Sequence, residues 1–254
     1  MSDRLIATIA IGDEATAIRR WSEPLLQAYA HVCGAELLYL NKTFRSRDTG
    51  KPAYEKFQLA DLLNRYDRIL FIDTDILVSP ESPNLFNLVP DSHLGAVSVE
   101  SVYKAVEKEK VASEEILGPL QWSQPYFNSG VILFSQRHRE MLESGAQLID
   151  RWHKGKLAQG IEARNDQTIF NYCLNTSGGT LHDLGPSFNF TRAWGRFHER
   201  FRHYFIHYAG LTGNRDWQMR RDYRILTKHS LRRLHARAPI ATWLLDRIEV
   251  ASRR

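Results

Sequence analysis

The sequence is poor in cysteine. Its 254 residues contain only Cys33 and Cys173, which form no C-x-x-C pair and are too few for a disulfide framework. Each lies in an apolar or helical context, where a thiol packs as a small hydrophobic group. We therefore expect both to be reduced residues in or near the core, as is usual in a reducing compartment.

Long hydrophobic runs are absent as well. The unbroken apolar runs are short, whereas a membrane-spanning helix needs about 20 residues, and the start MSDRLIATIAIGDEAT has no signal-peptide anatomy. A cytoplasmic protein is therefore expected. Because 43% of its residues are hydrophobic, the chain can still bury a core, and its length fits one α/β domain with or without a small appendage.

Excess positive charge is confined to the C-terminal end. Residues 219–254 hold ten Lys or Arg against three Asp or Glu, which gives +7, so with a net charge of +5 residues 1–218 carry −2. A slightly acidic body would repel a phosphate backbone, and we expect no nucleic-acid partner. The sequence therefore predicts a folded domain over residues 1–218 and a basic segment over residues 219–254.

Strand and helix patterns alternate through the first 175 residues. The expected strands are residues 4–12, 35–40, 69–72, 93–101 and 128–135, and the expected helices are residues 14–33, 54–66, 137–155 and a helix beginning at Asp166 with Asn165 as its N-cap. Residues 102–118 form a charged excursion, helical or mobile, that could act as a lid. This alternation favours an α/β fold with a largely parallel sheet and helices on both of its faces.

The stretch RILFIDTDILV places two carboxylates at the end of a buried strand. Asp73 and Asp75 follow the apolar run Ile69–Ile72 and are separated only by Thr74. Two acids that meet at the carboxyl edge of an α/β sheet, without an evident basic neighbour, repel each other unless a cation lies between them. A divalent metal is the simplest such cation. The alternative is structural, with Asp75 capping a turn and Asp73 facing solvent.

Four blocks of sequence carry a family resemblance. In their order along the chain, YEKFQLADLLNRYDRILFIDTDILV, YFNSGVILF, NDQTIFN and IHYAG resemble the glycogenin-like retaining glycosyltransferases, a group that includes bacterial lipooligosaccharide galactosyltransferases. The resemblance covers roughly residues 5–210. It implies a GT-A nucleotide-sugar domain that moves a hexose, glucose or galactose, from a UDP-sugar to a glycan, a lipid-linked glycan or another hydroxyl acceptor.

The resemblance assigns a divalent metal ion to Asp73, Asp75 and His207, the histidine of FIHYAG. The ion is usually Mn²⁺, with Mg²⁺ as the alternative, and Mn²⁺ accepts both oxygen and imidazole ligands. A divalent ion suits the reaction because it stabilises the negative charge that develops on the leaving nucleoside diphosphate. Without the resemblance, one His among ten is more often a structural residue.

Donor binding is assigned by the same resemblance. Lys56 matches a basic residue that contacts the donor near its phosphate and sugar, although it could also be a solvated lysine on an amphipathic helix. Asn128 in FNSG would direct its amide at the donor sugar, with Ser129 and Gly130 permitting a close approach, or it could be a turn residue that enters a strand. The remaining residues assigned to donor binding are Thr8, Ala10 and Gly210.

Asp166 and Gln167 match the DQ pair of the family. There the acid binds hydroxyls of the donor sugar, and the glutamine lies near the anomeric carbon on the face opposite the leaving group. An amide is a poor nucleophile, so we favour front-face attack guided by the leaving phosphate, with Gln167 stabilising the cationic sugar. The structural alternative is a pair of helix N-terminal residues favoured by the helix dipole.

Three positions depart from the family pattern. Ala15 stands near the place of an aromatic residue that stacks on the base, and Gly213 replaces a lysine that helps to bind the diphosphate, which leaves Arg215 as a candidate substitute. An acid that touches the sugar is also replaced, by Val99, and Glu100 is the nearest acid. The contacts to the base, the diphosphate and the sugar are therefore expected to differ from those of the family.

Two rival functions remain open. The missing lysine and aromatic residue would fit a catalytically inactive module that binds a nucleotide-sugar. A Mg²⁺-dependent phosphatase of the haloacid-dehalogenase type also places D-x-D at a strand end. Its motif, however, requires Thr or Val where this chain has Leu77, and it needs a downstream acidic pair that we do not find.

The C-terminal segment is basic and amphipathic. Its basic residues alternate with Ile225, Leu226, Leu231 and Leu234, and then with apolar residues at helical spacing beyond Pro239. Such a segment can lie on an anionic membrane surface, where each well-placed Lys or Arg adds about 1 kcal/mol. Peripheral binding to the inner face of a membrane would suit a lipid-linked acceptor. The alternative is a helix packed on the domain with its charges solvated.

Overall fold

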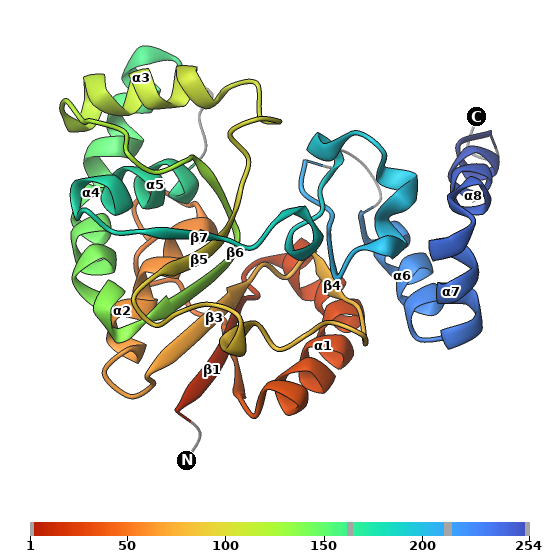
Figure 1. Ribbon diagram of the computed structural model, residues 1–254. Coiled ribbons are helices and arrows are strands. Elements are labelled where there is room, and N and C mark those ends of the chain that lie inside the picture. The colour runs from red at the N-terminus through yellow and green to blue at the C-terminus, as the bar shows by residue number, and fades with distance from the viewer. Residues whose placement is uncertain (1–2, 162–164, 211–214, 252–254) are drawn as a thin grey trace.

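The computed structural model describes residues 3–161, 165–210 and 215–251 (Figure 1). Its centre is a six-stranded sheet in the order β2-β1-β3-β6-β5-β7. The strands are Arg4–Ile9 (β1), Glu36–Leu40 (β2), Arg68–Ile72 (β3), Leu94–Ser98 (β5), Phe127–Ser135 (β6) and Leu181–Asp183 (β7). β6 runs antiparallel to β3 and β5, and the other pairings are parallel. The expected largely parallel sheet is confirmed.

Helices cover both faces of the sheet, as expected (Figure 1). One face carries α2 (Leu59–Leu62), α3 (Val106–Leu117), α4 (Arg139–Gln159) and α5 (Asp166–Thr176), and the other carries α1 (Asp13–Cys33) and α6 (Arg215–Leu226). Strand side chains alternate between these two cores: Phe71 of β3 packs into the first, and Leu70 and Ile72 pack into the second. Cys33 and Cys173 are buried free thiols, as predicted.

The segment before β3 differs from the single helix expected over residues 54–66. It is a 3₁₀-helix, Pro52–Gln58, followed by the short α2. The helix prediction assumed one buried apolar face, but this segment also buries two charged side chains. Glu55 accepts backbone N–H groups of residues 44–46, and Lys56 donates to a backbone carbonyl of β6.

Two details beside α5 refine the sequence prediction. The charged excursion over residues 102–118 is helical, because α3 lies within it. It packs on α5 through Glu109, because Oε2 of Glu109 accepts a hydrogen bond from the Thr168 hydroxyl at 2.5 Å. Asn165 occupies the N-cap position of α5, but its side chain makes no capping hydrogen bond. Its Oδ1 instead accepts from Nζ of Lys156 at 2.7 Å.

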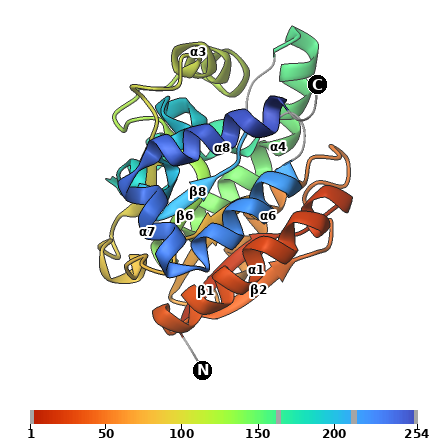
Figure 2. The same ribbon diagram turned by 90° about the vertical axis from the view of Figure 1, so that its right-hand side faces the viewer.

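Three helices end the described chain: α6, α7 (His229–Arg237) and α8 (Pro239–Ala251). α6 packs against α1, as Figure 2 shows, and it begins before residue 219, so the basic segment starts inside a helix that belongs to the domain. α7 and α8 pack on the 3₁₀ turn Phe197–Arg202. Across the described residues, no helix combines the length and the apolar character that crossing a bilayer requires.

Candidate active site

Both predicted carboxylates lie in the turn at the carboxyl end of β3. Asp73 and Asp75 connect β3 to a short strand, β4 (Ile76–Val78). β4 pairs antiparallel with β8 (Phe205–His207), and the register sets the first residue of β4 opposite His207. This two-stranded ladder joins segments that are far apart in the sequence. It brings the predicted histidine ligand to the predicted carboxylates.

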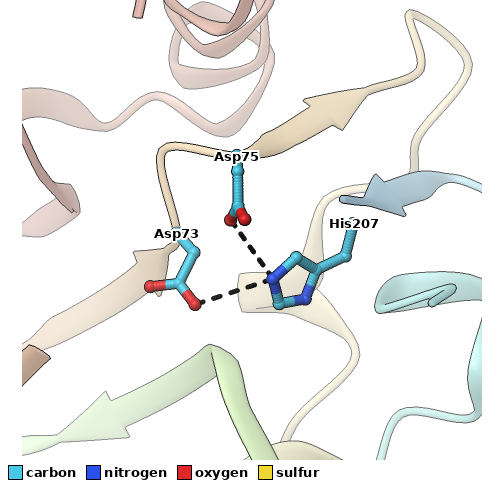
Figure 3. Close-up of side chains that lie close together, drawn as sticks. All are labelled: Asp73, Asp75 and His207. Carbon is cyan, nitrogen blue, oxygen red and sulfur yellow. Dashed lines mark ion pairs between the residues drawn. The ribbon is translucent and has the colours of Figure 1, made fainter. Parts of the chain in front are cut away.

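Figure 3 shows the three side chains facing one another. Nε2 of His207 lies 3.2 Å from Oδ1 of Asp75 and 3.8 Å from Oδ2 of Asp73. One ligand atom from each residue lies within 4.8 Å of the other two. Two carboxylates and one imidazole make a donor set that Mn²⁺ accepts, so these residues could hold a metal ion.

Asn189 holds the ring of His207 in one orientation. Nδ1 of His207 lies 2.7 Å from Oδ1 of Asn189, and because this amide oxygen only accepts, Nδ1 carries the proton and donates it. The lone pair of Nε2 is then free and is directed toward Asp73 and Asp75. A neutral imidazole with Nε2 unprotonated is the form that binds a metal.

A row of amides continues from this histidine to Gln167. Nδ2 of Asn189 donates to Oδ1 of Asn128 at 2.7 Å, and Nδ2 of Asn128 donates to Oε1 of Gln167 at 3.1 Å. The backbone N–H of Ser129 also donates to that glutamine oxygen, at 3.4 Å. We call Asn189, Asn128 and Gln167 the amide row. It connects the predicted metal ligand to the predicted catalytic residue.

Gly130 leaves room for His207. A Cβ at this position would lie 2.5 Å from Cε1 and 2.8 Å from Nδ1 of the ring, distances that the buried histidine could not accommodate without moving. The glycine was expected to permit the approach of a sugar, and the structure shows that the predicted metal ligand already requires it. Its backbone N–H also donates to Oδ1 of Asn128 at 2.8 Å.

Lys56 is buried between two acids and is not a solvated helix residue. Its Nζ lies 2.7 Å from Oδ2 of Asp166 and 3.2 Å from Oδ1 of Asp73. Burial alone would lower the pKa of Lys56, but the charges of Asp166 and Asp73 outweigh it and raise that pKa. The expectation that the carboxylate pair has no basic neighbour is therefore wrong.

The two carboxylates differ in acidity. Burial raises the pKa of Asp73 to about 6, an effect that Lys56 opposes and Asp75 reinforces. Burial acts in the same direction on Asp75, but His207, when its ring is protonated, and Arg215 outweigh it and lower its pKa. Nε of Arg215 lies 3.6 Å from Oδ2 of Asp75. Opposite pKa shifts in a close carboxylate pair are typical of functional sites.

A pocket of about 400 Å³ adjoins the carboxylates. It is lined by Asp73, Asp75 and Arg215 together with the β1–α1 turn and the first turn of α1, which contributes Ala15. None of the described residues that line it is aromatic, in agreement with the missing base-stacking residue. Gly213, the other departure from the family pattern, lies outside the described residues.

Thr8 lies near the end of β1, Ala10 directly follows that strand, and neither residue lines this pocket. Thr8 is fully buried, and its hydroxyl oxygen lies 3.0 Å from that of Thr74. Ala10 is 8% exposed. Their neighbours Ile9 and Ile11 are the residues of this stretch that line the pocket.

A second pocket, of about 210 Å³, contains three of the residues assigned to the donor. Asn128, Gln167 and Gly210 line it together with Val99. Glu100 is turned away, because its Oε2 accepts the backbone N–H of Tyr126 at 2.6 Å and its Oε1 pairs with Lys110. The acid at position 100 therefore does not replace the residue that the family uses to touch the sugar.

The match to a protein family covers most of the chain. The family model described as glycosyl transferase family 8 matches residues 18–218. The chain belongs to glycosyl transferase family 8. The resemblance drawn from the four sequence blocks is confirmed, and the phosphatase alternative is set aside. A comparison with curated proteins gives no match.

Solved glycosyltransferases share the fold of this family 8 member at low sequence identity. A glycosyltransferase involved in the glycosylation of the major capsid of PBCV-1 is 15% identical, with a TM-score of 0.60 over 86% of this chain and 98% of that one. The galactosyltransferase LgtC is 17% identical, with a TM-score of 0.57 over 87% and 94%. The expected GT-A fold is confirmed.

Asn189 is a site residue of this family 8 member that sequence reasoning missed. It stands between Phe188 and Phe190 in PSFNFTRAW, outside the four blocks. A polar amide inside an apolar stretch was the one available signal, and the side chain is indeed buried, with 1% of its surface exposed. Such a residue needs a partner inside the fold, but the sequence does not say which partner.

Replacing Asn189 with Ala should weaken Mn²⁺ binding by about 10- to 100-fold, because His207 would lose the acceptor that fixes its tautomer. Binding can be measured by calorimetry or by the electron paramagnetic resonance signal of free Mn²⁺, without any turnover. Asn41→Ala, at an exposed position with no role in the site, is the matched control. Equal Mn²⁺ affinity in the two variants would exclude a role for Asn189 in positioning His207.

Proposed function

We propose that this family 8 glycosyltransferase is a metal-dependent, retaining hexosyltransferase. It would move a hexose from a UDP-sugar to a hydroxyl of a glycan or lipid-linked glycan. The observation that carries the proposal is the convergence of Asp73, Asp75 and His207, with the amide row leading from His207 to Gln167. We assign catalysis to residues 1–218 and contact with the acceptor surface to residues 219–254.

The donor diphosphate would lie across the pocket beside the carboxylates. A divalent ion held by Asp73, Asp75 and His207, Mn²⁺ or else Mg²⁺, would offset the charge of the leaving diphosphate. Arg215 supports this placement, because its Nε is buried and has no hydrogen-bond partner among the described residues. A phosphate oxygen would satisfy this buried donor. Arg215 would then supply the charge that Gly213 cannot.

Retention of configuration would follow from front-face attack. Asp166 is poorly suited to act as a covalent nucleophile, because its Oδ2 lies 2.7 Å from Nζ of Lys56 and such an ion pair reduces nucleophilicity. Gln167 would stabilise the cationic sugar through the partial negative charge of its amide oxygen. Asn128 and the backbone of Ser129 hold that oxygen in place. The leaving phosphate would accept the proton of the acceptor hydroxyl.

The proposal is tested by Mn²⁺-dependent release of UDP from a panel of UDP-sugars, measured without acceptor. We expect slow release from one hexose, lost with a chelator and restored by added Mn²⁺. The alternative of an inactive binding module predicts Mn²⁺-dependent UDP binding without release from any donor, with or without glycan acceptors. Absence of both UDP binding and release would overturn the proposed function.

Peripheral membrane binding is part of the proposal and would place the enzyme on the cytoplasmic face. Leu234, Ile240 and Leu244 are 52%, 61% and 48% exposed on α7 and α8, next to exposed arginines, and this combination suits an anionic lipid surface. Replacing Leu234 and Ile240 with Ser should lower sedimentation with anionic vesicles about tenfold or more. Leu157→Ser, on α4, is the control, because Leu157 is also exposed. No vesicle binding by the full chain would exclude this part of the proposal.

A further inference from the structure

A third pocket, of about 480 Å³, lies between the turn Phe197–Arg202 and helices α6 and α8. Its walls are rich in aromatic and basic side chains. The principal ones are Phe197, Trp217, Trp243, Arg192, Arg221 and Arg247. A cavity of this size falls within the range of small-molecule sites, and the roles proposed above for the donor and the metal do not use it.

Of its three guanidinium groups, only that of Arg221 forms an ion pair with a carboxylate of the described residues. Arg221 pairs with Asp222 at 2.7 Å and with Asp246 at 2.8 Å, and Asp246, the acid in the pocket wall, is further held by Arg200 at 3.0 Å. Among the described residues, neither Arg192 nor Arg247 forms an ion pair. The wall therefore presents a net positive charge.

Both of these arginines are held over aromatic rings. The guanidinium carbon of Arg247 lies 4.3 Å from the ring centre of Trp243, and that of Arg192 lies 5.1 Å from the ring centre of Phe197. Partial burial and the nearby charge of Arg200 lower the pKa of Arg192, and they outweigh the opposing charge of Asp246. Stacked guanidinium groups lose little freedom when they bind a phosphate or carboxylate.

Arg192 also connects this pocket to the reaction centre. Together with Thr191 and Ala193, it lines the pocket of about 210 Å³ that contains Asn128 and Gln167. One residue thus forms part of the wall of both cavities. A molecule that occupies the third pocket could therefore extend past Arg192 toward Gln167.

We propose that the third pocket is an acceptor subsite that binds an anionic group, a phosphate or a carboxylate, carried by the acceptor glycan. The inference rests on the proposed function, because it is the acceptor that must reach Gln167. Arg192 and Arg247 would contact the anion, and the aromatic wall would contact the sugar to which it is attached. The glycan is thereby assigned to a chemical class: acidic, not neutral.

Binding of mannose 6-phosphate, mannose and inorganic phosphate tests the inference, with affinities taken from calorimetry or tryptophan fluorescence. The full chain is first saturated with UDP and Mn²⁺, so that the donor site is occupied. We expect mannose 6-phosphate to bind at least about tenfold more tightly than mannose or free phosphate. The double variant Arg192→Gln/Arg247→Gln should lose this preference. Arg233→Gln, at an exposed position on α7, should keep it.

Equal binding of mannose and mannose 6-phosphate would overturn the inference, as would a preference that survives in the double variant. Free phosphate that binds as tightly as the phosphorylated sugar would also overturn it, because the site would then recognise only an anion. The proposed function fails separately, if UDP does not bind with Mn²⁺. Selective binding of mannose 6-phosphate in that case would still support an acidic-sugar site.

Discussion

Replacing Asp75 with Asn should lower Mn²⁺-dependent release of UDP by about 10³-fold, a loss typical of removing one group that stabilises transition-state charge. Asp75 is the acidic partner closest to Nε2 of His207. Arg215, together with His207 when that ring is protonated, lowers the pKa of Asp75, so Asp75 stays ionised and available to a metal at neutral pH. The amide of Asn is nearly isosteric but carries no charge. Mn²⁺ binding, measured by calorimetry, should fall together with turnover.

Two further variants separate metal binding from donor binding. Asp67→Asn changes the acid that directly precedes β3, at the opposite end of this strand from Asp73. This variant should leave both Mn²⁺ affinity and UDP release unchanged. Arg215→Gln should keep Mn²⁺ affinity but raise the KM for the donor, because the arginine would contact the diphosphate and not the ion. Normal turnover in Asp75→Asn would remove this residue from the metal site.

The metal site was partly predictable because two of its members are local in sequence. Asp73 and Asp75 directly follow a buried strand, so an apolar run and a sheet edge suffice to place them. His207 could be found only through the family resemblance. Its position depends on the pairing of β4 with β8, and nothing in the short apolar stretch of β8 specifies β4 as its partner.

Other features of the site depend on contacts that no local pattern encodes. The sequence left Lys56 either at the donor or on a solvated helix face, and it did not predict that the fold buries this lysine between Asp73 and Asp166. Asn189 was missed, and Gly130 was explained by a sugar and not by the ring of His207. In each case the deciding neighbour comes from a distant part of the chain. The spacing of apolar residues predicted the layers of the fold correctly, because that spacing depends only on neighbouring residues within one helix or one strand.

Among the substitutions proposed for this protein, removing the charge of Asp222 should cause the largest loss of folding stability. Asp222→Ala would leave Arg200, which is fully buried, without its closest carboxylate, and breaking a buried ion pair costs about 3–5 kcal/mol. The free energy of unfolding, measured in urea, should fall by that amount. Asp216→Ala on the same helix is the matched control, because Asp216 pairs with the exposed Arg20 and exposed pairs contribute about 1 kcal/mol or less. Equal losses in the two variants would contradict a special role for the buried pair.

The same ion pair has a defined pH dependence and supports the metal site. Burial alone would raise the pKa of Asp222, but Arg200 and Arg221 outweigh it and lower the pKa. A carboxylate with a lowered pKa stabilises the fold above its usual value of about 3.9, and this stabilisation is lost as the pH falls through the native-state pKa. The difference in stability between the wild type and Asp222→Ala should therefore be constant near neutral pH and shrink only below about pH 4.

Tyr208 links this ion pair to the metal site, because it donates its hydroxyl to Asp222 at 2.7 Å and its backbone N–H to the carbonyl of Asp75 at 3.0 Å. We therefore expect Asp222→Ala to weaken Mn²⁺ binding as well, by a smaller factor than Asp75→Asn.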